Sequence, residues 1–471
     1  MADALYTKLR EVVRNAGQDH LLAHWETLAP TRQQHLADQI FAIDFPLLTE
    51  LTRTPNASQM RRPPAAHPSP PPAVPIESAG VADAQRTRAT GATALRSGQL
   101  GVILVAGGQG SRLGFDHPKG MFPIGPVSNR PLFQVLIDYL LAIRGRYQAS
   151  IPLFLMTSPA THDETIDFLA SHQRFGLPSE DLYVFCQGTM PVVDADSGRV
   201  LLDDRDSVCL SPDGHGGVLA ALKREGCLAA AADRGIDHLF YAQVDNPLAQ
   251  ICDPWLIGCH LQADSEMTTQ VIRKRDPQER VGNVVSIDEQ LRIIEYSDLS
   301  PDEAGRRNPD GRLTLWAGNM GVHVFQRQFL ERMVTSDEGL AFHRALKRTP
   351  FLGADGQRVT PPLPNSIKFE RFIFDLLPAA RNAIVVEGDP VSCFAPVKNA
   401  DTAATDTPTT AKRLMLDLYA TWLAAAGATI AEGTRVEINP RFALDAGELA
   451  TRIPAGHVFA ADSYLGPDQH L

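Results

Sequence analysis

Apolar and polar positions alternate along this chain with more than one period. Over residues 1–53 the apolar side chains return every three to four positions, for example at Leu9, Val12 and Val13, and this spacing predicts helices. From about residue 100 onward, short apolar runs such as GVILVA and IPLFLMT alternate with longer amphipathic stretches such as PLFQVLIDYLLAIRGRY. Strands that alternate with helices predict an α/β fold with a mostly parallel sheet covered by helices.

Residues 54–78 interrupt this pattern with a stretch rich in proline, alanine and serine. Such a composition cannot hold a helix or a central strand, so it predicts an extended connector, with a proline-rich ligand for another protein as the alternative. The α/β pattern predicts a main domain over 79–395. Residues 396–471 begin with a capped helix and continue with weak strand signals, which predicts a small C-terminal β-rich domain.

Composition narrows the class of protein. The 471 residues are 44% hydrophobic and 21% charged, as in a soluble globular protein, and the net charge of -11 argues against a nucleic-acid partner. The N-terminus lacks a signal-peptide core, and no window approaches 18 uninterrupted apolar residues, so we expect no membrane span. The six cysteines form no CxxC pair, which favours reduced thiols, a cytoplasmic location and no structural zinc.

The segment ILVAGGQGSRLGFDHPKG, residues 103–120, joins an apolar strand to a glycine cluster and two cations. It is not a Walker A loop, because Gly114 is followed by Phe115 rather than by lysine and a hydroxyl residue. It is not the dinucleotide-binding motif either, because Leu113 occupies the third glycine position. The segment therefore predicts a phosphate-binding loop of another type.

The residue types of this loop suit a nucleoside triphosphate. Gly107, Gly108 and Gly110 let backbone amides approach a polyphosphate or a base without a Cβ in the way. Arg112 adds a planar cationic fork and Lys119 a mobile point charge, a pair that suits a triphosphate whose outer two phosphates leave together. The alternative is a glycine-rich turn with solvated charges.

The loop resembles the signature of the UDP-sugar pyrophosphorylases, most of all the eukaryotic-type UDP-N-acetylglucosamine pyrophosphorylases. The resemblance continues in order through LFLMTS, FCQG, LSPDGHGG, VDNPL, VGNVV, IIEYSDLS, AGNMGVHVF, PNSIKFERFIFD and FAPVKNADTAATDTPTTA, over roughly residues 95–471. The tail after the last helix is shorter than in eukaryotic members. The resemblance implies a central Rossmann-like nucleotidyltransferase domain with smaller N- and C-terminal domains.

The reaction implied by this resemblance joins UTP and a sugar 1-phosphate into a UDP-sugar and releases pyrophosphate, with Mg²⁺ as cofactor. A phosphate oxygen of the sugar phosphate attacks the α-phosphorus of UTP. Because this nucleophile is already an anion, no general base is required, and the protein has to align two anions and neutralise charge in the transition state.

Two motifs carry the nucleotide and metal roles that the resemblance implies. The amide of Gln187 is expected to read the uracil edge beside Gly107, Gly108 and Gly214, because an amide offers both a donor and an acceptor. Asp245 ends the strand HLFYAQVD and is expected to hold Mg²⁺ together with substrate phosphates. The alternative for Asp245 is a helix N-cap, since DNP is also a capping pattern.

Further positions match family residues that contact phosphate and sugar. Lys398 is expected to reach the phosphates and Lys368 the sugar phosphate, although lysines are usually surface residues. Glu295 and Asn319 match positions that hydrogen-bond the sugar hydroxyls and the N-acetyl group, and Gly282 leaves room for close backbone contact with the sugar. Together these positions predict N-acetylglucosamine 1-phosphate as the substrate.

One position departs from this branch of the family. The expected PDGNGG reads PDGHGG, so His215 replaces an asparagine, as in UDP-glucose and broad-specificity UDP-sugar pyrophosphorylases. We keep these as the alternative, together with an inactive UDP-sugar sensor. A phosphotransferase is disfavoured by the missing Walker lysine and hydroxyl-activating aspartate motif. The expected partners are the two substrates, without nucleic acid or membrane, on a monomer or weak homo-oligomer.

Overall fold

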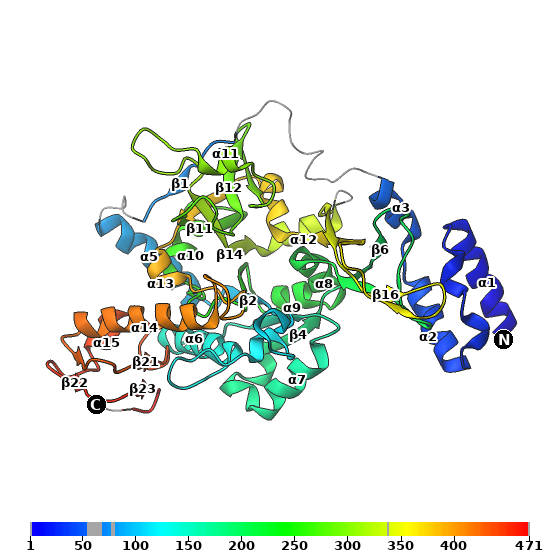
Figure 1. Ribbon diagram of the computed structural model, residues 1–471. Helices are drawn as coiled ribbons and strands as arrows, with labels where there is room; N and C mark the ends of the chain where they lie inside the picture. Colours follow the sequence, from blue (N-terminus) through cyan, green and yellow to red (C-terminus); the bar gives the residue numbers. More distant parts are fainter. Residues whose placement is uncertain (1, 54–67, 77–80, 337–338, 470–471) are drawn as a thin grey trace. The chain divides into compact units, whose positions relative to one another are not determined.

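A computed structural model of the chain (Figure 1) describes residues 2–53, 68–76, 81–336 and 339–469. The contacts divide the chain into two compact units, each assembled from three separate stretches. The predicted domains 1–53, 79–395 and 396–471 stay a prediction about which segments fold by themselves, and most of the predicted connector lies outside the described residues. Unit 1 comprises Met1–Ala66, Gln187–Val218 and Glu338–Asp375, and unit 2 comprises His67–Cys186, Leu219–Asp337 and Leu376–Leu471.

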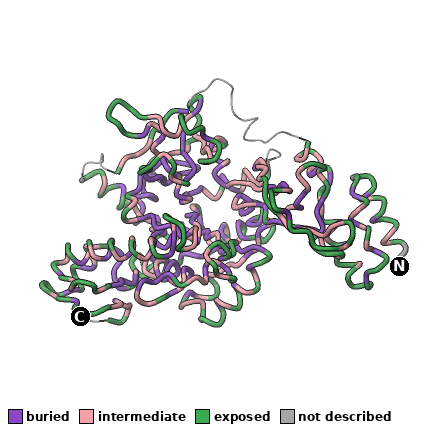
Figure 2. The backbone as a smooth tube through the Cα atoms, in the orientation of Figure 1, coloured by how far each residue is buried: buried purple, intermediate pink, exposed green. Residues whose placement is uncertain are grey.

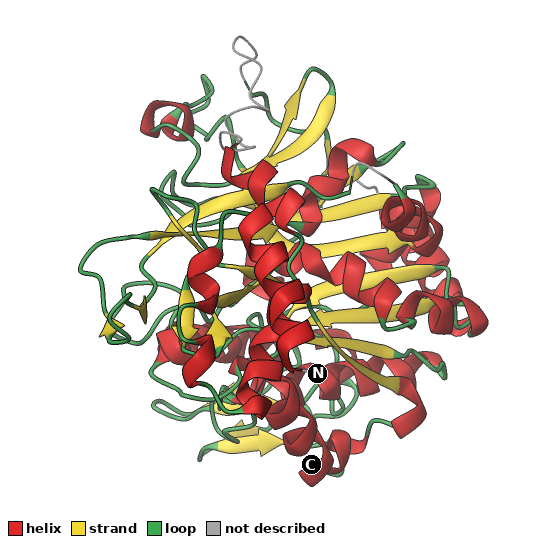
Figure 3. Ribbon diagram, turned by 90° about the vertical axis from the view of Figure 1, so that its right-hand side faces the viewer, coloured by secondary structure: helices red, strands yellow, loops and turns green. Residues whose placement is uncertain are grey.

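Unit 2 is built on one ten-stranded sheet, whose strands Figure 3 shows between layers of helices. Four neighbours, β10, β2, β3 and β4, run parallel, as do β1, β19 and β11, while β14 joins the two groups by antiparallel pairing with β10 and β11. The predicted mostly parallel central sheet is confirmed. The path follows β1 (Ala73–Val74), β19 (Ile384–Glu387), β11 (Met267–Arg273), β14 (Ala317–Gln326), β10 (His238–Gln243), β2 (Leu100–Val105), β3 (Leu153–Thr157) and β4 (Leu182–Cys186), and the hairpin β12 (Asn283–Ile287) and β13 (Gln290–Ile294) adds to β14.

The central strands are apolar on both faces because helices cover both. Strand β3 is buried along its whole length, and β2 at every position but its last. Buried backbone is drawn in purple in Figure 2. Helix α10 (Pro254–Gln262) is capped by Asp253, whose side chain accepts a hydrogen bond from the Trp255 amide at 3.1 Å, and proline occupies the first helical position. The covering helices include α5 (Val81–Arg96), α6 (Leu132–Tyr147), α10 (Pro254–Gln262) and α14 (Pro408–Ala425).

The C-terminal strands belong to unit 2 and confirm the predicted β-rich end of the chain. Two short parallel pairs follow α14, and a buried carboxylate fastens them to the main α/β body. Glu437, fully buried, accepts hydrogen bonds from the amides of Val127 and Ser128 and from the guanidinium of Arg130, the last at 2.9 Å. The pairs are β20 (Thr429–Ile430) with β22 (Val458–Phe459) and β21 (Val436–Ile438) with β23 (Ser463–Leu465).

Unit 1 confirms the predicted N-terminal helices. Their apolar stripe, with Leu9, Val13 and Leu36 fully buried, packs in one cluster with Val193 and Phe369 from later strands. The helices are α1 (Ala2–Asn15), α2 (Pro30–Phe41) and α3 (Phe45–Arg53), and an antiparallel sheet joins β15 (Phe342–Lys347), β18 (Ser366–Arg371) and β6 (Val193–Asp194).

Among the residues that the structure describes, none of the helices combines the length and the apolar character needed to cross a membrane.

Candidate active site

The glycine loop leaves the carboxyl end of β2 and folds back on itself. The amide of Lys119 donates to the carbonyl of Gly108 at 3.0 Å, and the Ser158 hydroxyl donates to the carbonyl of Gly107 at 2.7 Å. These bonds hold the lysine beside the first glycines of the loop. A Cβ added to Gly108 would meet no atom within 4 Å, so this side of the loop is open to a ligand. The loop thus combines rigid backbone with free space, as an anion-binding loop requires.

The cations of the loop differ in their surroundings. Arg112 lies on a short 3₁₀ turn, Ser111–Leu113, is exposed, and has no ion-pair partner within the described chain. Lys119 is shielded, with its side chain 16% exposed, and its Nζ lies 3.7 Å from Oδ2 of Asp245. Of the two, only Lys119 is held in place by the protein itself.

Asp245 sits at the same edge of the sheet because β10 and β2 are parallel neighbours. Val244, just after β10, donates to the carbonyl of Val105 at the end of β2 at 3.0 Å, so the two loops that follow start side by side. Ligands of such sheets bind beyond the carboxyl ends of the strands. The structure therefore brings Lys119, Asp245 and the open side of Gly108 into one region of unit 2.

Lys398 is carried to this region by a segment bonded to Asn246. The Asn246 side chain donates to the carbonyl of Cys393 at 2.8 Å and accepts from the amide of Ala395 at 3.0 Å. Two residues later, the amide of Val397 donates to the carbonyl of Asp245 at 2.8 Å. Asn246 was not among the predicted residues. Its position beside an end-of-strand aspartate was the only sign in the sequence of this role.

Asp406 is a second residue that sequence reasoning missed. Its carbonyl accepts the amides of Lys398 at 2.7 Å and of Asn399 at 3.0 Å. Burial raises the pKa of the Asp406 carboxyl, and the Asp245 charge raises it further, while the Lys398 charge opposes both. Asp406 therefore lies within electrostatic reach of both predicted residues. The sequence shows it only as the residue before a helix cap.

The carboxylate of Asp245 suits a hard divalent cation that shares its ligands with substrate. Within the described residues, no three histidine, cysteine, aspartate or glutamate side chains converge as a metal cage. A single carboxylate at the edge of a phosphate-binding loop agrees with the way Mg²⁺ usually binds, through one or two carboxylates together with substrate phosphates and water. The residues present fit such a shared site better than a closed one.

The predicted sugar residues of unit 2 lie together at the β12–β14 contact. The amide of Asn319 donates to the carbonyl of Gly282 at 2.8 Å. A Cβ on Gly282 would lie 2.8 Å from Ile293 and 3.2 Å from the carboxylate of Glu295. A side chain at this position would press on Ile293 and on the carboxylate of Glu295, so glycine allows the close packing seen here. The structure thus groups the three residues that were assigned to the sugar.

Unit 1 holds two of the predicted base-reading residues, Gln187 and Gly214, at one end of a two-stranded antiparallel sheet. Strands β5 (Thr189–Pro191) and β9 (Leu210–Pro212) pair, so Gln187 and Gly214 lie at adjoining ends of them. Gln187 is buried, and Gly214 has a φ of 84°, which favours glycine. Lys368, also in unit 1, lies in the middle of β18. The structure groups Gln187 with Gly214.

The surroundings of His215 favour the neutral form of its ring. Burial lowers its pKa to about 4, and the charge of His343 lowers it too, against the opposing effect of Asp375. Its Nδ1 accepts the amide hydrogen of Ile373 at 3.3 Å, and its ring stacks on Phe372 with centroids 5.2 Å apart. Because Nδ1 is an acceptor, the ring proton resides on Nε2. His215 therefore acts as a donor and not as a cation.

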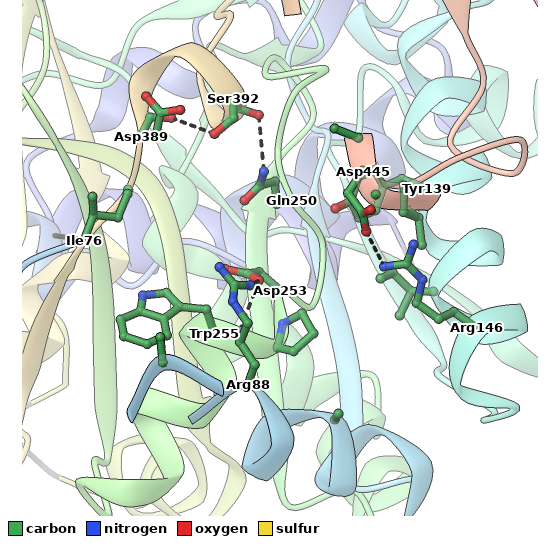
Figure 4. A pocket seen from close by; sticks show the side chains of 18 of the residues that line it. Ile76, Arg88, Tyr139, Arg146, Gln250, Asp253, Trp255, Asp389, Ser392 and Asp445 are labelled. Atoms are coloured by element: carbon green, nitrogen blue, oxygen red, sulfur yellow. Dashed lines mark hydrogen bonds and ion pairs between the residues drawn. The ribbon is translucent and has the colours of Figure 1, made fainter. Parts of the chain in front are cut away.

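A pocket in unit 2 lies at a different place from these residues. It measures about 910 Å³ and lies among α5, α6, α10 and the loops after β19 and α14 (Figure 4). Its walls carry opposite charges that are already paired, Arg88 with Asp253 at 3.5 Å and Arg146 with Asp445 at 2.8 Å. No predicted site residue lines it. The candidate site is therefore identified by the residues of the glycine loop and Asp245, which lie outside this pocket.

The chain is similar to a known family over most of its length. Residues 67–443 match the model of the family described as UTP–glucose-1-phosphate uridylyltransferase. A UDP-N-acetylhexosamine pyrophosphorylase-like protein 1 from Xenopus tropicalis is 34% identical over 433 residues, covering 89% of this chain and 84% of the relative. The UDP-N-acetylglucosamine pyrophosphorylase of Saccharomyces cerevisiae is 35% identical over 365 residues, covering 76% of each chain.

Solved structures of similarly named proteins resemble this chain as well. A putative UDP-N-acetylglucosamine pyrophosphorylase from Entamoeba histolytica superposes with a TM-score of 0.75 at 31% identity, covering 81% of this chain and 96% of the other. The uridine diphosphate N-acetylglucosamine pyrophosphorylase of Trypanosoma brucei, solved with an inhibitor, gives a TM-score of 0.82 at 25% identity, covering 98% of both chains.

Proposed function

The chain belongs to the UTP–glucose-1-phosphate uridylyltransferase family, and from this membership we propose that it joins UTP and N-acetylglucosamine 1-phosphate into UDP-N-acetylglucosamine and pyrophosphate. The observation that carries this function is the glycine loop with Lys119 held 3.7 Å from Asp245 at the carboxyl edge of the sheet. The names of the yeast and trypanosome relatives support the choice of sugar.

The chemistry needs cations more than a base. The sugar phosphate is an anion before it reacts, so the protein has to bring it in line with the α-phosphorus and offset the charge that develops on the departing pyrophosphate. Arg112 and Lys119 contact the outer phosphates, and Lys398 contacts the reacting phosphates. Asp245 holds Mg²⁺, which when bound supplies further neutralisation of the phosphate oxygens. Preorganised charges of this kind are commonly the largest contribution to catalysis.

Base and sugar are recognised by separate groups. Gln187 pairs with the uracil edge through its amide, with Gly214 in the adjoining turn. The backbone of Gly107 and Gly108 contacts the nucleotide. The close approach of Gly282, Glu295 and Asn319 supports an N-acetylhexosamine pocket, and Lys368 contacts the sugar phosphate. His215 contributes one neutral donor, which replaces the amide of the N-acetylglucosamine branch. A donor of a different shape gives preference and not exclusivity among sugars, because a merely roomy site discriminates by about 1–3 kcal/mol.

The proposed enzyme is cytoplasmic and is a monomer or a weak homo-oligomer. All six cysteines fall within the described residues and are free thiols, which supports a reducing compartment. We assign the nucleotidyltransferase role to residues 79–395 and an accessory role to the small region 396–471.

A panel of sugar 1-phosphates tests this function. Purified protein with UTP and Mg²⁺ is given N-acetylglucosamine, N-acetylgalactosamine or glucose 1-phosphate, and kcat/KM is obtained from pyrophosphate release. We expect the N-acetylglucosamine compound to rank first, with measurable turnover of at least one of the others. Glucose 1-phosphate in first place would favour the UDP-glucose or broad-specificity alternative. No pyrophosphate with any sugar would indicate an inactive sensor, and UDP as product would indicate a kinase.

A further inference from the structure

Unit 1 contains an ion pair between a buried aspartate, next to the predicted base-reading residue Gly214, and a half-buried arginine on the strand of Lys368. Asp213 is 2% exposed and directly precedes Gly214. The Nη2 of Arg371, the last residue of β18, donates to Oδ2 of Asp213, and the backbone amide of Arg371 donates to the carbonyl of Asp213 at 2.8 Å. The two residues are thus joined through both side chain and main chain.

The carboxylate of Asp213 fits into space that only glycines leave. The amide of Asp213 donates to the carbonyl of Gly188 at 3.1 Å, and a Cβ on Gly188 would lie 2.9 Å from Oδ2 of Asp213. A Cβ on Gly217 would overlap the same carboxylate, and a Cβ on Gly214 would lie 2.7 Å from the amide nitrogen of Arg371. One ion pair therefore contacts the residue after Gln187, the turn of Gly214 and the end of β18.

The two charges depend chiefly on each other. Within the described chain, Oδ1 of Asp213 and Nε of Arg371 are buried and make no hydrogen bond. The guanidinium also lies 4.7 Å from the ring centroid of Phe342, which fixes its plane. Because the Asp213 carboxylate has no second cation in contact with it, removing the arginine charge leaves a buried carboxylate uncompensated. Local rearrangement of the loops that it touches is the expected response.

We propose that the Asp213–Arg371 pair is a positioning device that fixes Gln187 and Gly214 for recognition of the uracil base. It rests on the proposed function, in which those two residues contact the base. The pair contacts neither substrate nor reacting atoms. It sets the spacing between the Gln187–Gly188 end and the Gly214 turn, and it anchors both to β18, which carries Lys368.

The pair is tested by three variants and a matched control. Arg371→Met removes the charge and keeps an apolar stem, Arg371→Lys restores the charge without the planar fork, and Asp213→Asn keeps the shape of the carboxylate. The control is Asp203→Asn, which breaks an exposed pair of unit 1, Arg358 with Asp203 at 3.0 Å. For each protein, kcat and KM are measured for UTP and for CTP with saturating N-acetylglucosamine 1-phosphate.

We expect Arg371→Met and Asp213→Asn to raise the KM for UTP at least about tenfold, to change kcat less than about threefold, and to reduce the preference for UTP over CTP. This is the pattern of lost uniform binding. Arg371→Lys should recover part of the loss, and the control should stay within about twofold. Circular dichroism identifies any variant that does not fold. If Arg371→Met does not fold, the KM and the base preference of Asp213→Asn decide whether the pair has a positioning role.

Unchanged KM and base preference in a folded Asp213→Asn or Arg371→Met protein would overturn the positioning role. A fall in kcat alone would overturn it too, because it would place the pair in the chemical step. The proposed function fails separately: a wild-type protein that releases no pyrophosphate from UTP defeats it before any variant is measured. In that case the dissociation constant for UTP, from calorimetry, replaces KM in the comparison.

Discussion

At the scale of single residues, the site depends on opposite charges that are kept close but partly open to solvent. Lys119 and Asp245 lie 3.7 Å apart, each side chain 16% exposed, so neither is neutralised as fully as a pair in direct contact would be. Both remain able to meet new partners, a phosphate for the lysine and a cation for the carboxylate. This arrangement suits a site that binds a polyanion together with a divalent metal.

Lys119→Ala removes the one loop cation that the protein holds in place. We expect kcat to fall at least about a hundredfold, the scale of losing one preorganised charge contact in the transition state. Pyrophosphate release at saturating substrates measures the change. Lys223→Ala, at the exposed end of α8 (Val218–Arg224), is the control and should leave kcat within about twofold. Near-normal turnover in folded Lys119→Ala would show that this lysine does not face the pyrophosphate.

His215 links the site to stability at low pH. Its pKa is about 4 in the folded chain and near 6.5 when unfolded, so between these values the unfolded state binds more protons and stability falls as pH falls. The wild type should lose on the order of 2 kcal/mol from this residue between pH 7 and pH 5. The His215→Asn protein lacks this titrating group, so its free energy of unfolding should fall by about 2 kcal/mol less than that of the wild type between pH 7 and pH 5. Urea unfolding at both pH values measures the difference. Equal losses in the two proteins would mean that His215 is not buried as a neutral ring.

At the scale of elements, the C-terminal strands are held by charge as well as by apolar packing. Arg130, just before α6, pairs with Asp138 of that helix and with Glu437 of β21, and all three side chains are at most 7% exposed. Asn439 donates to Asp138 at 3.1 Å. A buried network of this kind contributes little when complete but costs much when one partner is removed. It therefore fixes where the C-terminal region attaches.

Glu437→Gln tests this attachment. The amide keeps the shape but loses one acceptor position and the negative charge, so we expect about 3 kcal/mol of destabilisation. Hydrogen exchange of the β21 amides should accelerate together with the fall in the urea midpoint. The control is Asp462→Asn, which breaks the exposed pair with Arg435 and should cost less than about 1 kcal/mol. A Glu437→Gln protein as stable as the control would show that packing alone holds this region.

At the scale of the whole molecule, local sequence patterns predicted most of the secondary structure and the phosphate-binding loop, but they did not predict contacts between residues far apart in the chain. Period and alternation predicted the N-terminal helices and the sheet, because each is a property of neighbouring residues. The glycine loop predicted a phosphate site for the same reason. The antiparallel insertion of β14 could not be predicted, since strand direction is decided by partners far along the chain. Neither could Arg130 with Glu437, or Asp213 with Arg371, which lie 307 and 158 residues apart.

Seven of the positions assigned to catalysis and binding form three groups in the structure. Lys119 lies with Asp245 beside the glycine loop, Gly282 lies with Glu295 and Asn319, and Gln187 lies with Gly214. Sequence order alone predicted none of these neighbours, because each group joins segments that are separated by tens of residues or more. Their assigned roles stay predictions that the variants above address.

The most direct test of the central claim is the product of one reaction. UTP, N-acetylglucosamine 1-phosphate and Mg²⁺ are incubated with the protein and followed by phosphorus NMR, with a second sample that contains excess chelator. We predict that UDP-N-acetylglucosamine and pyrophosphate appear in equal amounts, and that the chelated sample forms neither. Formation of UDP in place of pyrophosphate, or the absence of any UDP-sugar from an active wild-type preparation, would contradict the assignment of this chain as a uridylyltransferase that acts on N-acetylglucosamine 1-phosphate.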